Sequence, residues 1–268
     1  MASPAQPPAL FAPAGEGFRA ASLTRGPWDA RMMHGGAPAA LLAHAIEQTQ
    51  PGAELAVTRL TLELLGGVPV GDVEVVTELT RPGKRFQVVD ATLTADGRRA
   101  CLARAVRVRR AEMPDAAALS PPLRVAAPLP GPDAGEPWLR LVEGDDLFYP
   151  GATEIVLVGG ATGSGHAIAW IRLRGDLLPG VAPSPLARAC AAADFSNGLS
   201  AILPFHAWLF VNTELTVHLH REPVGEWIGL DAHTVTGVAG FGLASGVLHD
   251  AGGPIGTCAQ SLFVQRRA

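Results

Sequence analysis

The chain has 268 residues, of which 48% are hydrophobic and 17% charged, enough apolar material for one large domain or two of ordinary size. The net charge of −4, without a basic block, argues against a nucleic-acid partner, and no apolar run is long enough to span a membrane. The chain has three cysteines, an odd number, and each lies in an apolar stretch: Cys101, Cys190 and Cys258. This pattern favours reduced core residues in a cytoplasmic protein over a set of disulfides.

The N-terminal stretch MASPAQPPALFAPAGEGF lacks the basic and apolar regions of a signal peptide, so we interpret it as a flexible, partly ordered arm. HisGlyGly then precedes an alanine-rich helix predicted over 37–48, with Pro38 in its first turn. Glycines let a ligand approach the backbone, and a helix N-terminus offers unpaired N–H groups. We therefore expect this segment to bind substrate, with the oxyanion donor from Gly36 or Ala37, unless it is a plain turn; the candidates are His34, Gly35, Gly36 and Ala37.

Alternating strands follow this helix, and their sequence recurs later in the chain. VTRLTLELLGGVPVGD (57–72) matches NTELTVHLHREPVGEW (212–227), and ACLARAVRVRR (100–110) matches TCAQSLFVQRR (257–267). The offset is about 155 to 157 residues throughout. Matches that keep the same order along the chain predict a duplicated domain.

The segment between the copies, residues 113–137, is rich in Pro and Ala and has no hydrophobic period, which predicts a linker. It divides the chain into 1–112, including the arm, and 138–268. In the second part Ser184 is the predicted N-cap of a helix, and GGATGSG (159–165) is a predicted hairpin turn. One helix enclosed by an antiparallel sheet, twice over, is an α+β architecture.

Two polar residues of the second copy are candidates for catalysis. Asp194 follows a run of alanines with no Lys or Arg within four residues, a setting that suits a general base if the carboxylate is buried. Gln260 stands where the first copy has Ala103, and a buried amide needs partners. We infer that one of two ancestral sites kept its polar groups, while the region near Ala103 is closed or apolar. The alternative for Asp194 is a position on a solvated helix face, and the alternative for Gln260 is a position on the protein surface.

Residues 212–220 alternate cleanly in polarity. Leu215, Val217 and Leu219 are predicted on one strand face, and Asn212, Glu214, Thr216, His218 and His220 on the other. HisLeuHis has a spacing that metals use, but no third ligand stands out and His206 and His233 are isolated, so we expect neither a metal nor a cofactor. The sequence contains no G-x-S-x-G motif, which argues against a serine α/β-hydrolase.

These motifs together resemble the double-hotdog acyl-CoA thioesterases of the thioesterase-like superfamily, related to the type II enzymes. The resemblance covers nearly the whole chain beyond the arm and rests on HGG (34–36), WIRLRGD (170–176), PLARACAAADFSNG (185–198), NTELTVHLHREPVGEW and AQSLFVQRR (259–267). It implies two hotdog halves side by side and an Asp, a Thr or Ser, and a Gln that activate a water. The Asp falls on Asp194 and the Gln on Gln260. The hydroxyl position falls on Asn212, with Thr213 and Thr216 as the nearby hydroxyls.

The expected function is therefore hydrolysis of acyl-CoA or another acyl thioester by a cytoplasmic enzyme without cofactor or metal, with a homo-oligomer possible. One rival is a hotdog-fold hydratase or dehydratase of enoyl or hydroxyacyl thioesters, in which His34 or His218 would matter more than Gln260. The other is a non-catalytic acyl-thioester binding protein, for which the missing hydroxyl at Asn212 is the best support.

Overall fold

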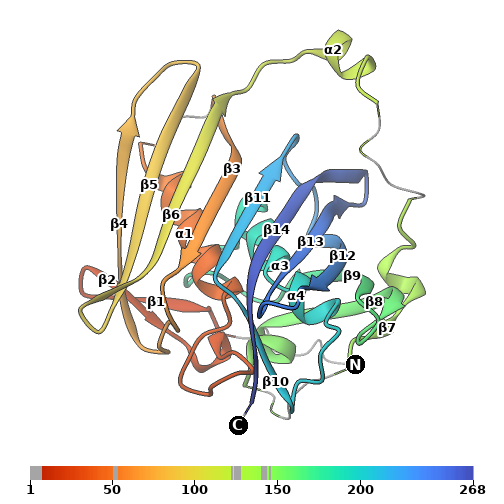
Figure 1. Cartoon of the computed structure of the whole chain (residues 1–268). Coiled ribbons are helices and arrows are strands. Elements are labelled where there is room, and N and C mark those ends of the chain that lie inside the picture. The colour runs from red at the N-terminus through yellow and green to blue at the C-terminus, as the bar shows by residue number, and fades with distance from the viewer. Residues whose placement is uncertain are drawn as a thin grey trace, which may run out of the picture.

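The computed structural model describes residues 8–50, 54–121, 123, 128–139, 144 and 146–267. Its described strands form one antiparallel sheet (Figure 1). They are β1 (Phe11–Ala14), β2 (Gly17–Ala20), β3 (Leu55–Leu64), β4 (Asp72–Arg81), β5 (Phe86–Ala95), β6 (Arg98–Arg109), β7 (Glu136–Pro137), β8 (Thr153–Ala161), β9 (His166–Leu173), β10 (Trp208–Asn212), β11 (Glu214–Leu219), β12 (Trp227–Thr236), β13 (Phe241–Asp250) and β14 (Gly253–Arg266). The order across the sheet is β1-β2-β4-β5-β6-β3-β11-β14-β13-β12-β9-β8-β7, and β10 also pairs with β14.

Two alanine-rich helices, α1 (Gly36–Gln48) and α3 (Pro185–Ala193), pack against each other and against this sheet. α1 contacts β3 to β6, whereas α3 contacts β9 and β11 to β13. Alanine suits both helices because a small side chain lets a neighbouring backbone approach closely. Ser184 caps α3 as predicted, since its Oγ accepts the N–H of Ala187 at 3.1 Å. A short helix, α4 (Ser196–Leu199), follows α3 after Asp194 and Phe195.

The same strand order occurs around each helix. After α1 the chain forms β3 to β6, which lie in the order β4-β5-β6-β3; after α3 it forms β11 to β14, in the order β11-β14-β13-β12. β3 and β11 meet as antiparallel neighbours between the two groups, with Thr61 opposite Thr216. The segments that match in sequence, 57–64 and 212–219, therefore lie side by side (Figure 1).

The described part of the predicted flexible arm is folded. β1 and β2 pair as a hairpin, and the side chains of Leu10 and Phe11 are buried in the core. Their backbone N–H groups donate to the carbonyls of Asp176 and Leu177 at 3.0 Å. Two large apolar side chains in a Pro- and Ala-rich stretch are sufficient to anchor it, which its composition did not reveal. Residues 1–7 of the predicted arm lie outside the described residues.

The predicted linker includes two short helices, α2 (Pro114–Ala118) and the 3₁₀ helix η2 (Pro132–Ala134), as well as β7. Residues 122 and 124–127 of this linker lie outside the described part of the chain. The bounds that we assign to the linker and to the two halves stay a prediction.

The long strand predicted over 212–220 is interrupted at Thr213, between β10 and β11. On the neighbouring β14, Leu262 lies opposite Asn212 and Ala259 lies opposite Thr216. The step between these pairs is four residues along one strand and three along the other. One extra residue inverts the in–out alternation, so the prediction that Asn212 and Thr216 share a face is wrong.

The three cysteines are buried and form no disulfide with one another, as their contexts predict. Burial raises the pKa of Cys101 to about 12 and that of Cys258 to about 11, so both thiols stay neutral. No helix among the described residues has the length and apolar character that crossing a membrane requires.

One buried ion pair ties the end of β13 to the loop after β11. The Asp250 side chain is 1% exposed and accepts hydrogen bonds from both terminal nitrogens of Arg221, at 2.5 and 2.6 Å. It also accepts the backbone N–H groups of Val224 and Gly252. Burial alone would raise the pKa of Asp250, but these four donors hold it below its ordinary value.

Candidate active site

A cavity of about 440 Å³ opens where the N-terminus of α1 meets the end of α3 and the strand β10. Five of the predicted site residues line it: His34, Gly35, Asp194, Asn212 and Thr213. Much of the remaining wall is aromatic or aliphatic and includes Trp28, Met32, Met33, Trp138, Tyr149, Phe195, Phe205 and Phe210. An apolar wall with a few converging polar groups is the usual composition of a small-molecule site.

Asp194 is the C-terminal cap of α3, and its side chain is 4% exposed. Its Oδ1 accepts a hydrogen bond from Nδ2 of Asn212 at 2.9 Å and from Nε2 of Gln260 at 3.3 Å. Its Oδ2 lies 2.9 Å from Nδ1 of His34. Among the described residues no Arg or Lys forms an ion pair with this carboxylate, so neutral donors hold it in place.

The His34 ring packs against two aromatic rings. Its imidazole centroid lies 4.9 Å from that of Phe148 and 4.4 Å from that of Phe195. Besides Asp194, its Nδ1 faces the backbone N–H of Gly36 at 3.1 Å. One ring nitrogen cannot donate to the carboxylate and accept from Gly36 at once. The carboxylate contact therefore needs a proton, either on His34 Nδ1 or on Asp194 Oδ2.

Gly35 and Gly36 are required by close packing. Gly35 has an ordinary φ of −58°, but a Cβ there would lie 2.8 Å from both carboxylate oxygens of Asp194. A Cβ on Gly36 would lie 2.9 Å from the carbonyl oxygen of Ala191 and from the Phe148 ring. A side chain at either position would push the two helices or the carboxylate apart.

The expected oxyanion donors differ from those that the structure leaves available. The N–H of Gly36 faces His34 Nδ1, and the N–H of Ala37 donates to the His34 carbonyl at 3.0 Å. Neither residue lines the cavity. Gly35 does line it, and within the described part of the chain its N–H has no acceptor. Of the three N–H groups, only that of Gly35 belongs to a residue that lines the cavity, whereas the predicted donors were Gly36 and Ala37.

Gln260 lies behind Asp194, is 0% exposed and does not line the cavity. Its Nε2 faces both the carboxylate Oδ1 and the backbone carbonyl of Asp194 at 3.3 Å. Its Oε1 accepts the backbone N–H of Asn197 at 3.1 Å. The amide thus hydrogen-bonds both ends of the turn between α3 and α4. Gln260 is buried, so the alternative that it is a surface residue is wrong. Its counterpart Ala103 could make none of these hydrogen bonds.

The strand residues differ in their position relative to Asp194. The interruption at Thr213 turns Asn212 inward, where it binds the carboxylate. Thr213 is exposed, and its Oγ1 faces the Ser261 carbonyl at 3.2 Å. Thr216 does not line the cavity and instead bonds Thr61 and Glu214. The structure therefore brings Asn212 to Asp194 and does not bring Thr216 there.

A second cavity of about 370 Å³ is lined by residues of both parts of the chain, near the end of α1 and the start of α3. Val57 and Leu219 line the second cavity. In the aligned repeat Val57 matches Asn212 and Leu219 matches Leu64, and both of these matching residues line the first cavity. The prediction of a closed or apolar counterpart cavity is therefore wrong, because four charged residues line this one. They are Glu47, Arg107, Arg110 and Glu222. Ala103 does not line it.

The acid of this second cavity is Glu47, near the end of α1. It accepts a hydrogen bond from Oγ of Ser184, the N-cap of α3, at 2.5 Å. Burial raises its pKa above the ordinary value, although the Ser184 bond opposes that shift. Each helix thus ends in an acid that touches the start of the other helix, but only Asp194 has Asn and Gln partners.

Sequence reasoning missed several residues that shape the site. Asn197 joins Gln260 to β10 through its side chain, which donates to the Phe210 carbonyl at 2.9 Å. Trp28 and Phe205 lie 4.5 Å apart at their ring centroids and form part of the cavity wall. The 177-residue separation of that aromatic pair leaves no local pattern in the sequence. For Asn197, its place beside Asp194 in the helix-stop motif was a usable signal.

Two family models match the chain: the acyl-CoA thioesterase N-terminal domain over residues 24–109 and the acyl-CoA thioesterase C-terminal domain over residues 114–264. A comparison with curated proteins gives no significant match. The models together cover both helices and nearly all of the strands described above.

Solved structures with similar folds agree with the family match. A proposed thioesterase from Novosphingobium aromaticivorans has a TM-score of 0.71 at 22% identity, over 98% of this chain and 99% of that one. A hot dog fold protein from Alicyclobacillus acidocaldarius has 0.74 at 16%, over 96% of each. The acyl-CoA thioesterase II TesB2 from Mycobacterium marinum has 0.67 at 16%, over 95% of each. This chain belongs to the acyl-CoA thioesterase family, and it is a thioester hydrolase with the hotdog fold.

Proposed function

We propose that the chain hydrolyses acyl-CoA thioesters in the 440 Å³ cavity, with Asp194 as the general base. The observation that carries this proposal is the environment of that carboxylate. It lines the cavity, its side chain is only 4% exposed, and Asn212 and Gln260 orient it through one oxygen. Such a group is held firmly enough to aim at one bound water.

In the proposed reaction Asp194 accepts a proton from a water whose oxygen attacks the thioester carbonyl carbon. The C–S bond then breaks, the CoA thiolate takes up the proton held by Asp194, and the acyl group leaves as a carboxylic acid. The N–H of Gly35, which has no acceptor within the described chain, supports a role in binding the oxyanion. The apolar wall would hold the acyl chain.

Asn212 takes the position where the resemblance implies a hydroxyl residue. We assign it the same task, because its Nδ2 donates to Asp194 Oδ1 at 2.9 Å as a hydroxyl could. Thr213 and Thr216 receive no role, since one is exposed and the other bonds Thr61 and Glu214. This assignment weakens the non-catalytic alternative, whose main support was the missing hydroxyl.

The hydratase or dehydratase alternative keeps one specific observation in its favour. His34 Nδ1 lies 2.9 Å from Asp194 Oδ2, and both residues line the cavity. Such a pair could hold a water for addition to an enoyl thioester instead of attack on the carbonyl. His218 has no such support, because it is exposed on β11 and does not line the cavity.

One experiment separates the three functions. The purified chain is incubated with saturated acyl-CoAs of increasing length and with the matching 2-enoyl-CoAs. Free thiol is followed with a thiol reagent, and hydration by loss of enoyl absorbance. We expect thiol release from saturated substrates. Hydration without thiol release would support the hydratase, and tight binding without either reaction would support the binding protein.

We also propose that the chain is a double hotdog derived by duplication. The matched segments, the equal strand order and the two related cavities support this architecture. In this proposal only the second copy kept the Asn and Gln partners of its acid. The buried, unpaired cysteines support a cytoplasmic location, and association of copies into a homo-oligomer is a further proposal that sedimentation would test.

Replacing Gln260 with alanine copies the first half and should lower kcat by roughly 10–100-fold, the usual worth of one hydrogen bond to a charged group. The carboxylate would remain but lose one of its donors, and the Asn197 N–H would lose its acceptor. We therefore expect a folded protein of lower stability. Steady-state thioesterase kinetics and circular dichroism measure the two effects.

The matched control is Gln265→Ala, which removes an exposed amide from the same strand. It should leave both kcat and the unfolding temperature unchanged. Equal activity of Gln260→Ala and the wild type would remove Gln260 from the proposed mechanism.

A further inference from the structure

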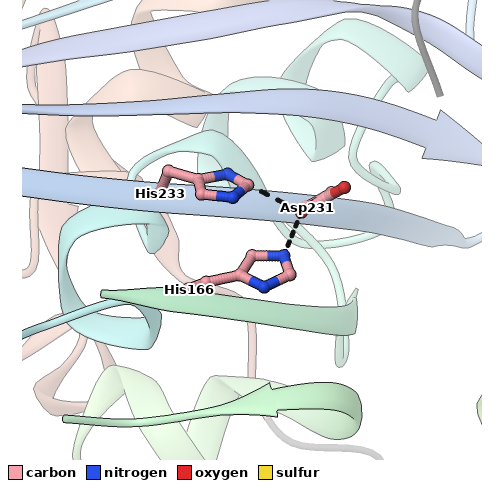
Figure 2. A group of neighbouring side chains, drawn as sticks. All are labelled: His166, Asp231 and His233. Carbon is pink, nitrogen blue, oxygen red and sulfur yellow. Dashed lines mark hydrogen bonds and ion pairs between the residues drawn. The ribbon is translucent and has the colours of Figure 1, made fainter. Parts of the chain in front are cut away.

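Three side chains of the types that bind metals meet on the C-terminal part of the sheet (Figure 2). None of them lines the cavity described above. His166 lies on β9, whereas Asp231 and His233 lie on β12. His166 and His233 are directly opposite in the antiparallel register. Asp231 precedes His233 by two residues and so projects from the same face. Two hydrogen-bonded strands therefore hold all three side chains together.

The ligand atoms of these residues are close enough to share one ion. Asp231 Oδ1 lies 2.8 Å from His166 Nε2 and 3.9 Å from His233 Nδ1, and the three ligand atoms lie within 4.8 Å of one another. A tetrahedral zinc ion with bonds of about 2.0–2.2 Å needs ligand atoms roughly 3.3 Å apart. Small rotations about the side-chain torsions would bring the measured separations to that value.

The arrangement has the partial exposure that a site for an incoming ion requires. The side chains of His166, Asp231 and His233 are 40%, 23% and 58% exposed, so an ion could enter and a water could complete its coordination. The two imidazole rings are stacked, with centroids 4.1 Å apart, and one nitrogen of each ring lies within 3.9 Å of the same Asp231 oxygen. Two imidazoles and a carboxylate favour zinc and its late first-row neighbours over magnesium or calcium.

We propose that His166, Asp231 and His233 form a binding site for one divalent transition-metal ion of the zinc type. The bound ion would link β9 to β12 and stabilise the C-terminal half. It would take no part in the thioester reaction, because none of its three ligands lines the catalytic cavity. The sequence did not suggest the site, since His233 is isolated along the chain and its partner His166 is on another strand.

The test uses the full, tag-free chain after treatment with a chelator and dialysis, and ZnCl₂ alone as the probe. Calorimetry should show one saturable equivalent of zinc per chain. Saturating zinc should raise Tm by about 5 °C, the size expected when the ion reaches about 100 times its Kd. Co²⁺ at the same site should give the visible absorption of a tetrahedral centre.

The double variant His166→Ala/His233→Ala should weaken zinc binding at least 100-fold. Its matched control is His218→Ala/His220→Ala, which also removes two exposed imidazoles but leaves the cluster intact; binding should not change. Absence of a saturable equivalent in the wild type would overturn the proposal, as would loss of binding in the control pair only. Thioesterase activity is not needed as a readout, so these outcomes do not depend on the proposed function.

Discussion

Replacing Asp194 with asparagine should lower kcat for the best acyl-CoA by about 10²–10⁴-fold, the usual contribution of general-base catalysis. The asparagine Oδ1 can still accept hydrogen bonds from Asn212 and Gln260. Its Nδ2 can donate a hydrogen bond to His34 Nδ1 when that nitrogen carries no proton. Size, packing and hydrogen bonds are therefore kept, and only the base is lost. Steady-state kinetics measure the loss, and the unfolding temperature checks that the variant is folded.

Glu47→Gln is the matched control for this variant. Glu47 also lies near the end of a central helix, lines a cavity and touches the start of the other helix. Its cavity lacks the Asn and Gln partners, so its loss should leave thioester hydrolysis unchanged. Unchanged turnover of Asp194→Asn would mean that the proton goes to another group, His34 first, and would favour the hydratase or the non-catalytic alternative.

Asp250→Ala should lower the free energy of unfolding by about 3 kcal/mol, the lower end for breaking a buried ion pair, because Arg221 is one-third exposed. The variant leaves the Arg221 guanidinium without its anion and the N–H groups of Val224 and Gly252 without their acceptor. Urea unfolding at pH 7 measures the change, and Tm should fall by roughly 6–12 °C.

The effect of Asp250 should also depend on pH in a defined direction. Its donors hold the folded-state pKa below the unfolded value, so its stabilisation is present above the unfolded pKa, about 3.9 for an aspartate. That stabilisation is lost as pH falls through the folded-state pKa. The difference between Asp250→Ala and the wild type should therefore shrink in acid.

The control is Asp72→Ala, which breaks a similar two-bond pair with Arg19 at the surface, where the side chains are 63% and 67% exposed. Solvent screens an exposed pair, so Asp72→Ala should lose much less stability than Asp250→Ala. If the two variants lost equal stability, burial would not be the source of the Asp250 effect.

The sequence was sufficient to predict the features that depend on local pattern. Alanine-rich stretches with a Ser-Pro start or a HisGlyGly start gave both central helices, because capping and helix spacing are short-range properties. The offset between matching segments indicated a duplicated chain, and the placement of equal strands around each helix supports it. Asp194 and Gln260 were selected as candidates for two different reasons. Asp194 is an acid after a run of alanines, and Gln260 is an amide where the first copy has Ala103.

Local pattern failed where one residue changes a register. The extra residue at Thr213 turns Asn212 toward Asp194 and leaves Thr216 among other strand residues. A strict period of two cannot reveal such an irregularity, because Leu215, Val217 and Leu219 after it still alternate with polar residues. The ordered part of the arm is non-local in the same way, since the N–H groups of Leu10 and Phe11 donate to distant backbone carbonyls.

The sequence by itself therefore determined the two central helices and the family resemblance, and it singled out Asp194 and Gln260 as candidates. Only the tertiary structure decided which groups meet: His34 against Asp194, Gly35 so near that a Cβ there would lie 2.8 Å from the Asp194 oxygens, and His166 beside Asp231 and His233. These contacts join residues 65 to 160 positions apart. They arise from helix packing and strand register, which depend on the whole sheet, and no single segment of the chain carries them.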